Sequence, residues 1–445
     1  MSSPLRRTLT TASLVFVMYF NVSGGAFTTE SLIISTGPGL GLLILILVPL
    51  FWSLPETLLV AELASMLPDE GGYYKWVYRA FGPFWAFQNG WWTWMYSLVD
   101  MAIYPVLFNQ YLGFFFPHIG PVAQWLIALA VIWIATGINL RGAGRVGSVS
   151  IISGSFILAT FLLIAIAAIP HIGHVPWHPF AKKDVSGFGG LGLGISIALW
   201  NYIGWDNAST VQGEVVNATK TYPRALALTL PLVVLGYIVP LTATLGASDW
   251  TKWQEGGWPE IARASTGSLG PFLAVCVALA GMVSALALFN ALLLSYSRIP
   301  FAMAGDSLLP SFLSRPDARG TPRNAVIISA VCYSVFALLS FAHLVVADVL
   351  LYSMALFLEF GALIALRINE PELRGAYRIP TGTGGVIILT AIPVVILTVV
   401  TGLETKDGEY GLPAIVAALG AAAIGLPLYW WVNRTLRAGF KEPAR

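Results

Sequence analysis

Four acidic residues fall inside stretches of the sequence that are otherwise apolar. Each stretch is long enough to cross a lipid bilayer, which takes about 20 residues, and the four acids are Glu30, Asp100, Asp206 and Glu359. A charged carboxylate at that depth costs about 2.5–3.5 kcal/mol on the insertion scale. No Lys or Arg lies well inside any of these stretches. The acids therefore need a proton, a bound cation or contact with water, and their pattern predicts proton or cation binding.

Asp100 is the strongest candidate among them. It lies halfway along the apolar run 83–116, and Tyr104 follows it one helical turn later on the same face. We expect Asp100 to hold an amine group or a proton. The alternative is a buried acid that is hydrogen-bonded to a backbone carbonyl of a broken helix, which would offset the cost of burial.

Three further acids, Glu56, Glu62 and Glu214, lie nearer the ends that we expect to face the cytoplasm. We interpret Glu62 and Glu214 as structural acids or as parts of an inner gate, able to pair with cytoplasmic arginines. The full set of candidates for proton coupling or gating is Glu30, Asp206, Glu62, Glu214 and Glu359.

Two apolar runs are interrupted by short polar segments that contain glycine. The first interruption spans residues 21–25, and the second spans 201–207, with Gly204 and Asp206. Glycine lets a helix open, and open backbone at membrane depth is stable only where it lines a cavity inside the protein. We therefore expect two broken helices with a binding site at the breaks. For the second segment, the alternative is a kinked structural helix in which Asp206 pairs with a neighbour.

The breaks also indicate what kind of ligand group each one suits. Free N–H groups at the start of the half-helix after the first break suit a carboxylate, and free carbonyls at the second break suit an ammonium group. The ring of Trp200 can cover a cationic group, a contact worth about 0.5–2 kcal/mol. Amine recognition has more support than carboxylate recognition. The expected substrate-binding residues are Ser23, Gly24, Gly25, Asp100, Tyr104, Trp200, Asn201, Tyr202, Gly204 and Asp206.

Membrane-spanning helices must position these residues. Hydrophobic residues make up 57% of the chain and charged residues 10%, whereas a soluble domain averages about 25% charged residues. Twelve apolar runs predict spans at 9–36, 38–67, 83–116, 121–139, 146–169, 187–216, 224–246, 270–303, 324–342, 345–366, 384–403 and 411–432. With both termini in the cytoplasm, all but five of the 24 Lys and Arg residues lie on the cytoplasmic side, as the positive-inside rule requires.

The two breaks lie five spans apart, which predicts an inverted repeat with the substrate at the repeat interface. Residues 9–169 and 187–366 would form the two halves, in opposite orientation because five is odd, and 384–432 would add two helices. The predicted fold class is an all-α integral membrane protein of one domain, with twelve transmembrane helices, a five-plus-five inverted repeat, and helices 1 and 6 broken.

The sequence offers no sign of a cofactor or a metal centre. None of the five His residues has a partner at metal-ligand spacing, and both cysteines fall in apolar spans. The net charge of +2 comes with no long basic run, so nucleic acid is not an expected partner.

Several strings of residues resemble the amino acid–polyamine–organocation superfamily of twelve-span permeases, over nearly the whole chain. The passage 99–108 is similar to the plant-type polyamine uptake permeases, and so are strings within 23–30, 52–56, 71–76, 81–88 and 204–225. This resemblance implies a leucine-transporter-like fold, alternating access, and proton-coupled uptake of polyamines or related amino acids.

The segment 199–204 is also similar to the sixth-helix break of bacterial arginine/agmatine exchangers. In those proteins the Trp that matches Trp200 stacks on the substrate guanidinium, and the acid that matches Asp206 is implicated in the response to protons. Some members of the superfamily carry a Lys in the fifth helix in place of a coupling ion. The fifth span here has none, so a carboxylate is left to carry the proton.

We interpret the chain as a secondary transporter of the cytoplasmic membrane, not an enzyme, that imports polyamines or other cationic amines, with protons and membrane lipid as its other partners. One alternative is a permease or exchanger for a broad set of amino acids or for neutral ones. A second alternative, from a different class, is a transporter-like nutrient sensor that binds its ligand without accumulating it.

Overall fold

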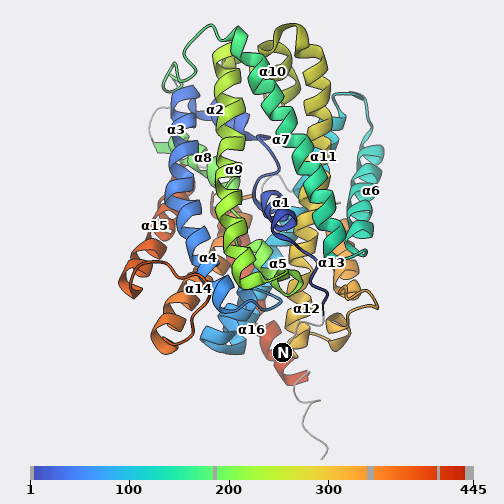
Figure 1. Ribbon diagram of the computed structural model, residues 1–445, viewed down its shortest axis with the longest axis vertical. Helices are drawn as coiled ribbons and strands as arrows, with labels where there is room; N and C mark the ends of the chain where they lie inside the picture. The colour runs from blue at the N-terminus through green and yellow to red at the C-terminus, as the bar shows by residue number, and fades with distance from the viewer. Residues whose placement is uncertain (1–4, 184–187, 338–344, 408–410, 436–445) are drawn as a thin grey trace, which may run out of the picture.

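The computed structural model describes residues 5–183, 188–337, 345–407 and 411–435, and in these residues the chain folds into helices with no β-strand (Figure 1). An isolated backbone bridge joins Leu9 and Val215. The first eight α-helices are α1 (Thr11–Val22), α2 (Thr29–Thr36), α3 (Pro38–Val48), α4 (Leu54–Met66), α5 (Tyr73–Leu112), α6 (Pro121–Asn139), α7 (Ala143–Ala168) and α8 (Phe188–Trp200). The others are α9 (Ala218–Ala247), α10 (Trp258–Ser265), α11 (Gly270–Tyr296), α12 (Arg298–Gly305), α13 (Arg323–Phe336), α14 (Val345–Asn369), α15 (Thr383–Asp407) and α16 (Gly411–Thr435).

Short segments of 3₁₀ or π-helix join or extend these helices. They are η1 (Pro49–Ser53), η2 (Ile169–His171), η3 (Asn207–Glu214), η4 (Trp250–Lys252), η5 (Gly267–Leu269) and η6 (Ser311–Ser314). The all-helical fold class predicted from the sequence is confirmed for the described residues. Arg437, Lys441, Arg445 and the predicted span limits at 187 and 342 lie outside those residues.

Many of the helices are long and apolar enough to cross a membrane. Among the described residues seven stretches meet this test: Pro38–Met66, Pro121–Asn139, Ala143–His171, Ala218–Ala247, Gly267–Gly305, Leu350–Asn369 and Ile415–Thr435. Four shorter apolar helices accompany them, at Thr11–Val22, Leu191–Trp200, Arg323–Phe336 and Thr383–Val399. Most of the long helices run along the longest axis of the molecule (Figure 1). The arrangement is that of a multi-pass membrane protein.

The outer surface of the helices carries large apolar side chains. Val122 on α6, Ile152 on α7, Phe272 on α11 and Ile388 on α15 are between 64% and 71% exposed. Soluble proteins rarely expose extended apolar surfaces, whereas lipid tails cover such side chains at no cost. This surface therefore faces the hydrocarbon of a bilayer.

Both predicted helix breaks are present. The first apolar run divides into α1, which ends at Val22, and α2, which begins at Thr29. Gly24 and Gly25 adopt φ angles of 73° and 121° between them, a conformation that glycine accepts readily. In the sixth run, α8 ends at Trp200 and Gly204 adopts a φ of 100°.

The second half of the sixth run differs from the expected α-helix. Residues 207–214 form the 3₁₀-helix η3, whose sequence NASTVQGE is rich in residues that favour turns and caps over α-helix interiors. The third run also begins earlier than expected, because α5 starts at Tyr73 and Gly82, with a φ of 82°, interrupts it. The predicted start at residue 83 therefore marks this kink.

The broken helix α1 lies in the middle of the bundle (Figure 1). It packs against α7, α9 and α11, and α5 packs against α11 and α14. The end of α1, the end of α8 and the middle of α5 meet at one place, although they are far apart in the sequence.

Candidate functional site

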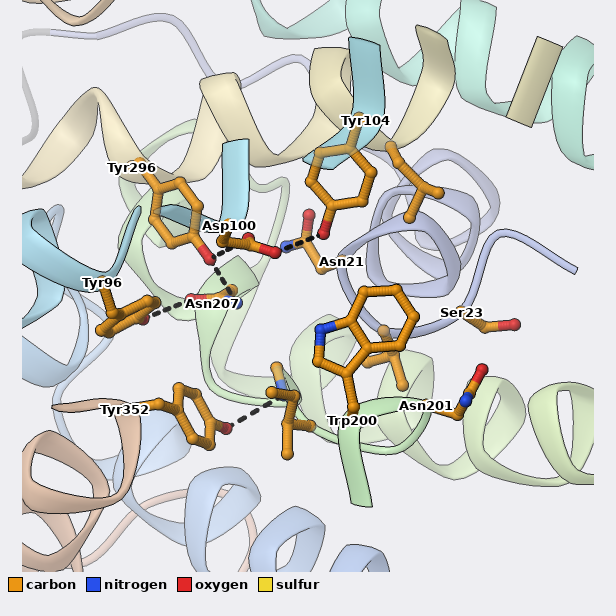
Figure 2. A pocket seen from close by; sticks show the side chains of 14 residues that line it. Asn21, Ser23, Tyr96, Asp100, Tyr104, Trp200, Asn201, Asn207, Tyr296 and Tyr352 are labelled. Atoms are coloured by element: carbon orange, nitrogen blue, oxygen red, sulfur yellow. Dashed lines mark hydrogen bonds between the residues drawn. The ribbon is translucent and has the colours of Figure 1, made fainter. Parts of the chain in front are cut away.

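A cavity lies between the two helix breaks, and Figure 2 shows the side chains around it. It is small in this structure, about 40 Å³, which is room for a few water molecules. The first break supplies Asn21, Val22 and Ser23, the second supplies Trp200, Asn201, Ile203 and Gly204, and η3 supplies Asn207. Helix α5 adds Tyr96, Asp100 and Tyr104, α11 adds Leu288 and Tyr296, and α14 adds Tyr352.

Asp100 is the one formally charged side chain among these described lining residues. It is buried, and two tyrosine hydroxyls donate to it: Tyr104 to Oδ1 at 2.7 Å and Tyr296 to Oδ2 at 3.0 Å. The bond from Tyr104 follows from its position four residues along the same helix. The partners of Asp100 are thus hydroxyls from α5 and α11, and a carboxylate oxygen keeps further lone pairs for a ligand.

The cavity has more hydrogen-bond acceptors than donors at the first break. The side-chain Oδ1 of Asn21 is buried without a hydrogen-bond partner among the described residues. The backbone carbonyls of Asn21 and Val22 likewise accept no hydrogen bond within that part of the chain. Both α1 and α8 end at the cavity, and a helix C-terminus carries a partial negative charge. This surrounding favours a ligand that brings positive charge and N–H donors.

Three N–H groups of the first break, those of Ser23, Gly24 and Gly25, are used within the protein. Ser23 and Gly24 both donate to the Tyr19 carbonyl, at 2.8 and 3.3 Å, and Gly25 donates to the Ser23 hydroxyl at 3.1 Å. The half-helix that follows begins with an internal bond from Thr29 N to the Ala26 carbonyl. These four N–H groups are therefore not free to bind an anion.

Aromatic side chains form the walls of the cavity. Tyr96 lies edge-on to Tyr296 and Tyr352, with ring centroids 5.7 and 5.5 Å apart. Asn207 joins two of the rings, because Tyr96 donates to its Oδ1 at 3.2 Å and its Nδ2 donates to Tyr296 at 3.4 Å. The Trp200 ring lies across from these tyrosines in Figure 2, where it can cover a cationic group.

The two breaks touch each other at Gly204. A Cβ atom at this position would lie 2.4 Å from the Asn21 carbonyl oxygen, so the close approach requires glycine. The N–H of Gly204 donates to the Tyr352 hydroxyl at 2.9 Å. The geometry of the second break therefore depends on both α1 and α14.

The cavity lining includes six of the ten residues predicted to bind substrate: Ser23, Asp100, Tyr104, Trp200, Asn201 and Gly204. The other four are Gly24, Gly25, Tyr202 and Asp206. The Gly24 carbonyl accepts a hydrogen bond from Ser284, and Gly25 packs against Ile157 and Phe161. The hydroxyl of Tyr202 donates to the Leu45 carbonyl at 3.0 Å. This carbonyl lacks its usual helical donor, because the residue four positions later, Pro49, has no N–H. Asp206 lies behind Tyr352, which donates to it at 2.9 Å.

Sequence reasoning missed Tyr96, Asn207, Tyr296 and Tyr352 as lining residues. Tyr96 could have been found, because it lies four residues before Asp100 and so shares a helix face with Asp100 and Tyr104. Asn207 falls at the edge of the predicted second interruption. No local signal marks Tyr296 or Tyr352, which are tyrosines within long apolar helices.

Glu30 and Glu359 lie outside the cavity. Glu30 accepts a hydrogen bond at 2.8 Å from the N–H of Gly256, in the segment before α10. Glu359 is 1% exposed, and neither of its carboxyl oxygens has a hydrogen-bond partner among the described residues.

Glu62 and Glu214 form buried ion pairs with arginines, as the sequence predicts. Arg367 binds Glu62 at 2.5 Å and Arg298 binds Glu214 at 2.8 Å. Arg298, near the end of its predicted span, is fully buried, with Glu70 3.9 Å away as a second acid. Its burial is tolerated because two acids face it.

The fold and the cavity define a membrane transport protein whose site suits small molecules with amine groups. Comparison with known proteins agrees: the chain belongs to the amino acid permease family, whose profile matches residues 7–424. The resemblance drawn from the sequence motifs is thereby confirmed.

Individual relatives are similar over most of their length. The chain is 35% identical to polyamine transporter PUT1 of Oryza sativa subsp. japonica over 95% of this chain and 78% of that protein. It is 33% identical to polyamine transporter RMV1 of Arabidopsis thaliana, over 97% and 86%. It is 27% identical to the branched-chain amino acid permease BcaP of Lactococcus lactis subsp. cremoris, over 72% and 73%.

Proposed function

We propose that this chain is a secondary active transporter that imports polyamines or related cationic amines across the cytoplasmic membrane, coupled to protons. The observation that carries the proposal is the acceptor-rich cavity around Asp100. A ligand with ammonium groups is favoured by the carboxylate of Asp100, by the Oδ1 of Asn21, which has no hydrogen-bond partner among the described residues, and by the C-terminal ends of two helices. The names of the relatives PUT1 and RMV1 point to the same class of substrate.

The proposed architecture has twelve spans, both termini in the cytoplasm, and two inverted halves at residues 9–169 and 187–366. Each predicted span overlaps at least one helix of the described residues, which supports this count. The two breaks meet at one cavity, as expected where a substrate site lies at a repeat interface. The small volume of the cavity is consistent with a closed state in an alternating-access cycle.

A permease for neutral amino acids is the second candidate, and the similarity to BcaP favours it. An α-amino acid needs donors for its carboxylate next to acceptors for its amine. The internal hydrogen bonds of Ser23, Gly24 and Gly25 leave the cavity short of such donors. The contacts of the first break therefore favour amines over amino acids.

Uptake by proteoliposomes tests the proposal. The purified protein should accumulate labelled putrescine when the outside is made acidic, and excess spermidine should compete more strongly than excess leucine or alanine. Stronger competition by leucine would favour the amino acid permease. Binding of putrescine without accumulation would favour a nutrient sensor, and either result would overturn the proposal.

A further inference from the structure

A single tyrosine hydroxyl joins two buried acids just behind the cavity. The hydroxyl oxygen of Tyr352 lies 2.7 Å from Oε1 of Glu56, on α4, and 2.9 Å from Oδ1 of Asp206. The N–H of Gly204 donates to the same oxygen at 2.9 Å. Glu56 is fully buried, and Asp206 and Tyr352 are each 2% exposed. Three groups thus converge on one oxygen.

The hydrogens available at this oxygen exclude a pair in which both acids are ionised. A tyrosine hydroxyl carries one hydrogen and can accept two hydrogen bonds. Its hydrogen serves one of the two carboxyls, and the N–H of Gly204 occupies one acceptor position. The remaining contact is satisfied only if the other carboxyl donates a hydrogen of its own. At least one of Glu56 and Asp206 is therefore protonated.

The surroundings place the proton on Glu56. Asp206 directly precedes η3, where the first N–H groups of a helix favour a negative charge. The second oxygen of Glu56 is buried with no hydrogen-bond partner in the described residues, which suits a neutral acid. Among the ion pairs of those residues, no Lys, Arg or His binds either acid.

The other titratable groups that face this pair come from three helices. They are Glu359 on α14, Tyr73 and Tyr96 on α5, and Tyr222 on α9. Glu359 lies two helical turns beyond Tyr352, towards Arg367 and the end of α14 that we expect to face the cytoplasm. Both of its oxygens lack hydrogen-bond partners in the described residues, which suits a neutral acid that can relay a proton from Glu56.

We propose that Glu56 and Asp206, bridged by Tyr352, bind one exchangeable proton, and that this proton is the coupling ion. The coupling role of this proton rests on the proposed amine import, whereas the presence of a shared proton does not depend on that proposal. With the proton bound, Glu56 donates to Tyr352 and Tyr352 donates to Asp206. When Glu56 passes its proton to one oxygen of the neutral Glu359, Glu359 releases its own proton from the other oxygen towards the cytoplasmic side, and Glu56 becomes an anion. Two anions then compete for one hydroxyl hydrogen.

Loss of the proton reaches the substrate cavity through Gly204. The same hydroxyl oxygen holds the N–H of Gly204, and Gly204 is in close contact with the Asn21 carbonyl of the first break. Repulsion between Glu56 and Asp206 therefore strains the point where the two breaks meet. This contact gives proton release a direct way to open the cavity.

Infrared spectroscopy of the purified full-length protein tests the shared proton. The wild-type protein should show a carbonyl band of a protonated carboxyl group, and Glu56→Gln should remove part of its intensity. The Gln amide can donate to Tyr352 as the protonated acid does, so this variant should fold. The exposed Glu372→Gln is the matched control and should leave the band unchanged. An unchanged band in Glu56→Gln would overturn the shared proton.

Transport by the same variant tests the coupling. Accumulation of labelled putrescine driven by a pH gradient should fall to the level seen without a gradient, while exchange of labelled for unlabelled putrescine continues. Gradient-driven accumulation by Glu56→Gln would overturn the coupling role and leave the proposed import standing. Loss of exchange in a variant that unfolds at the wild-type temperature would also contradict it. If the wild-type protein moves no amine, the proposed function fails, and the infrared result still decides the shared proton.

Discussion

Buried acids occur in two regions of this protein, and they differ in what neutralises them. Near the end expected to face the cytoplasm, Glu62 and Glu214 are bound by Arg367 and Arg298. At the helix breaks, Asp100 has two tyrosine hydroxyls as its partners instead of a resident base. Both regions hold buried carboxyl groups. The difference teaches that an acid with a resident arginine holds the fold together, whereas an acid without one is available to a mobile cation.

In the Glu62–Arg367 pair, both side chains have further hydrogen-bond partners besides each other. Besides the ion pair, Glu62 accepts a hydrogen bond from the N–H of Ile379 at 2.8 Å, and Arg367 donates to the Thr381 carbonyl at 2.8 Å. The pair joins α4 and α14 to the segment before α15. The guanidinium of Arg367 already supplies the positive charge there, so this acid needs no cation from outside.

Removal of a resident base is expected to have the largest effect. Arg367→Leu leaves Glu62 buried without its cation, and breaking a buried pair in this way costs about 3–5 kcal/mol of stability. The thermal unfolding temperature of the purified protein should fall accordingly. The double variant Glu62→Met with Arg367→Leu should recover most of the loss, because no unpaired charge remains. A single variant as stable as the wild type would show that the pair is not structural.

Removal of the cavity acid is expected to affect binding more than stability. Asp100→Asn keeps the shape of the side chain but loses its charge, and a hydrogen bond to a charged group contributes about 1.5–3 kcal/mol. Putrescine affinity, measured by titration calorimetry, should therefore weaken by about 10- to 100-fold. Unchanged affinity, or a loss of stability as large as that of Arg367→Leu, would remove the distinction between the two regions.

The aromatic wall is expected to contribute less than the charge. Trp200→Ala should weaken putrescine binding by about 0.5–2 kcal/mol, the range of a cation–π contact. Trp200→Phe should retain part of the affinity, because a smaller ring still presents a negative face. Equal losses in Ala and Phe would mean that the size of the indole matters rather than its charge distribution.

Much of this contrast could be predicted from the sequence, because it rests on local signals. Glycines within apolar runs located both breaks, and the i to i+4 spacing paired Asp100 with Tyr104. The position of two acids near the ends of spans predicted that they could pair with cytoplasmic arginines, without indicating which ones. These inferences need only neighbouring residues and the cost of burying a charge.

The rest depends on how distant helices pack. Tyr296 and Tyr352 reach the cavity because α11 and α14 turn these faces towards α5, and hydropathy alone does not indicate which face turns inward. The N–H groups of the first break were expected to bind a carboxylate. Instead, the N–H groups of Ser23 and Gly24 donate hydrogen bonds to the Tyr19 carbonyl, because of the path that the backbone takes between α1 and α2.

Substitution of Glu370, an acid at the surface of the protein, is expected to have the smallest effect, in contrast to substitution of the buried acids. Two hydrogen bonds from the Arg79 guanidinium hold the pKa of Glu370 below its usual range. A lowered pKa in the folded state adds stability above the unfolded value of about 4.3, and this stability is lost as the pH falls through the folded value. The unfolding temperatures of wild type and Glu370→Gln should differ slightly at neutral pH and converge in acid. A difference that grows on acidification would contradict this sign.

The affinities of lysine and cadaverine test the central claim most directly, because these two ligands differ only by a carboxylate. The cavity offers Asp100 and other acceptors to amines, and the N–H groups of Ser23, Gly24 and Gly25 are already used. Titration calorimetry on the wild-type protein should therefore show tighter binding of cadaverine, and Asp100→Asn should reduce this preference. Equal or tighter binding of lysine would contradict the account.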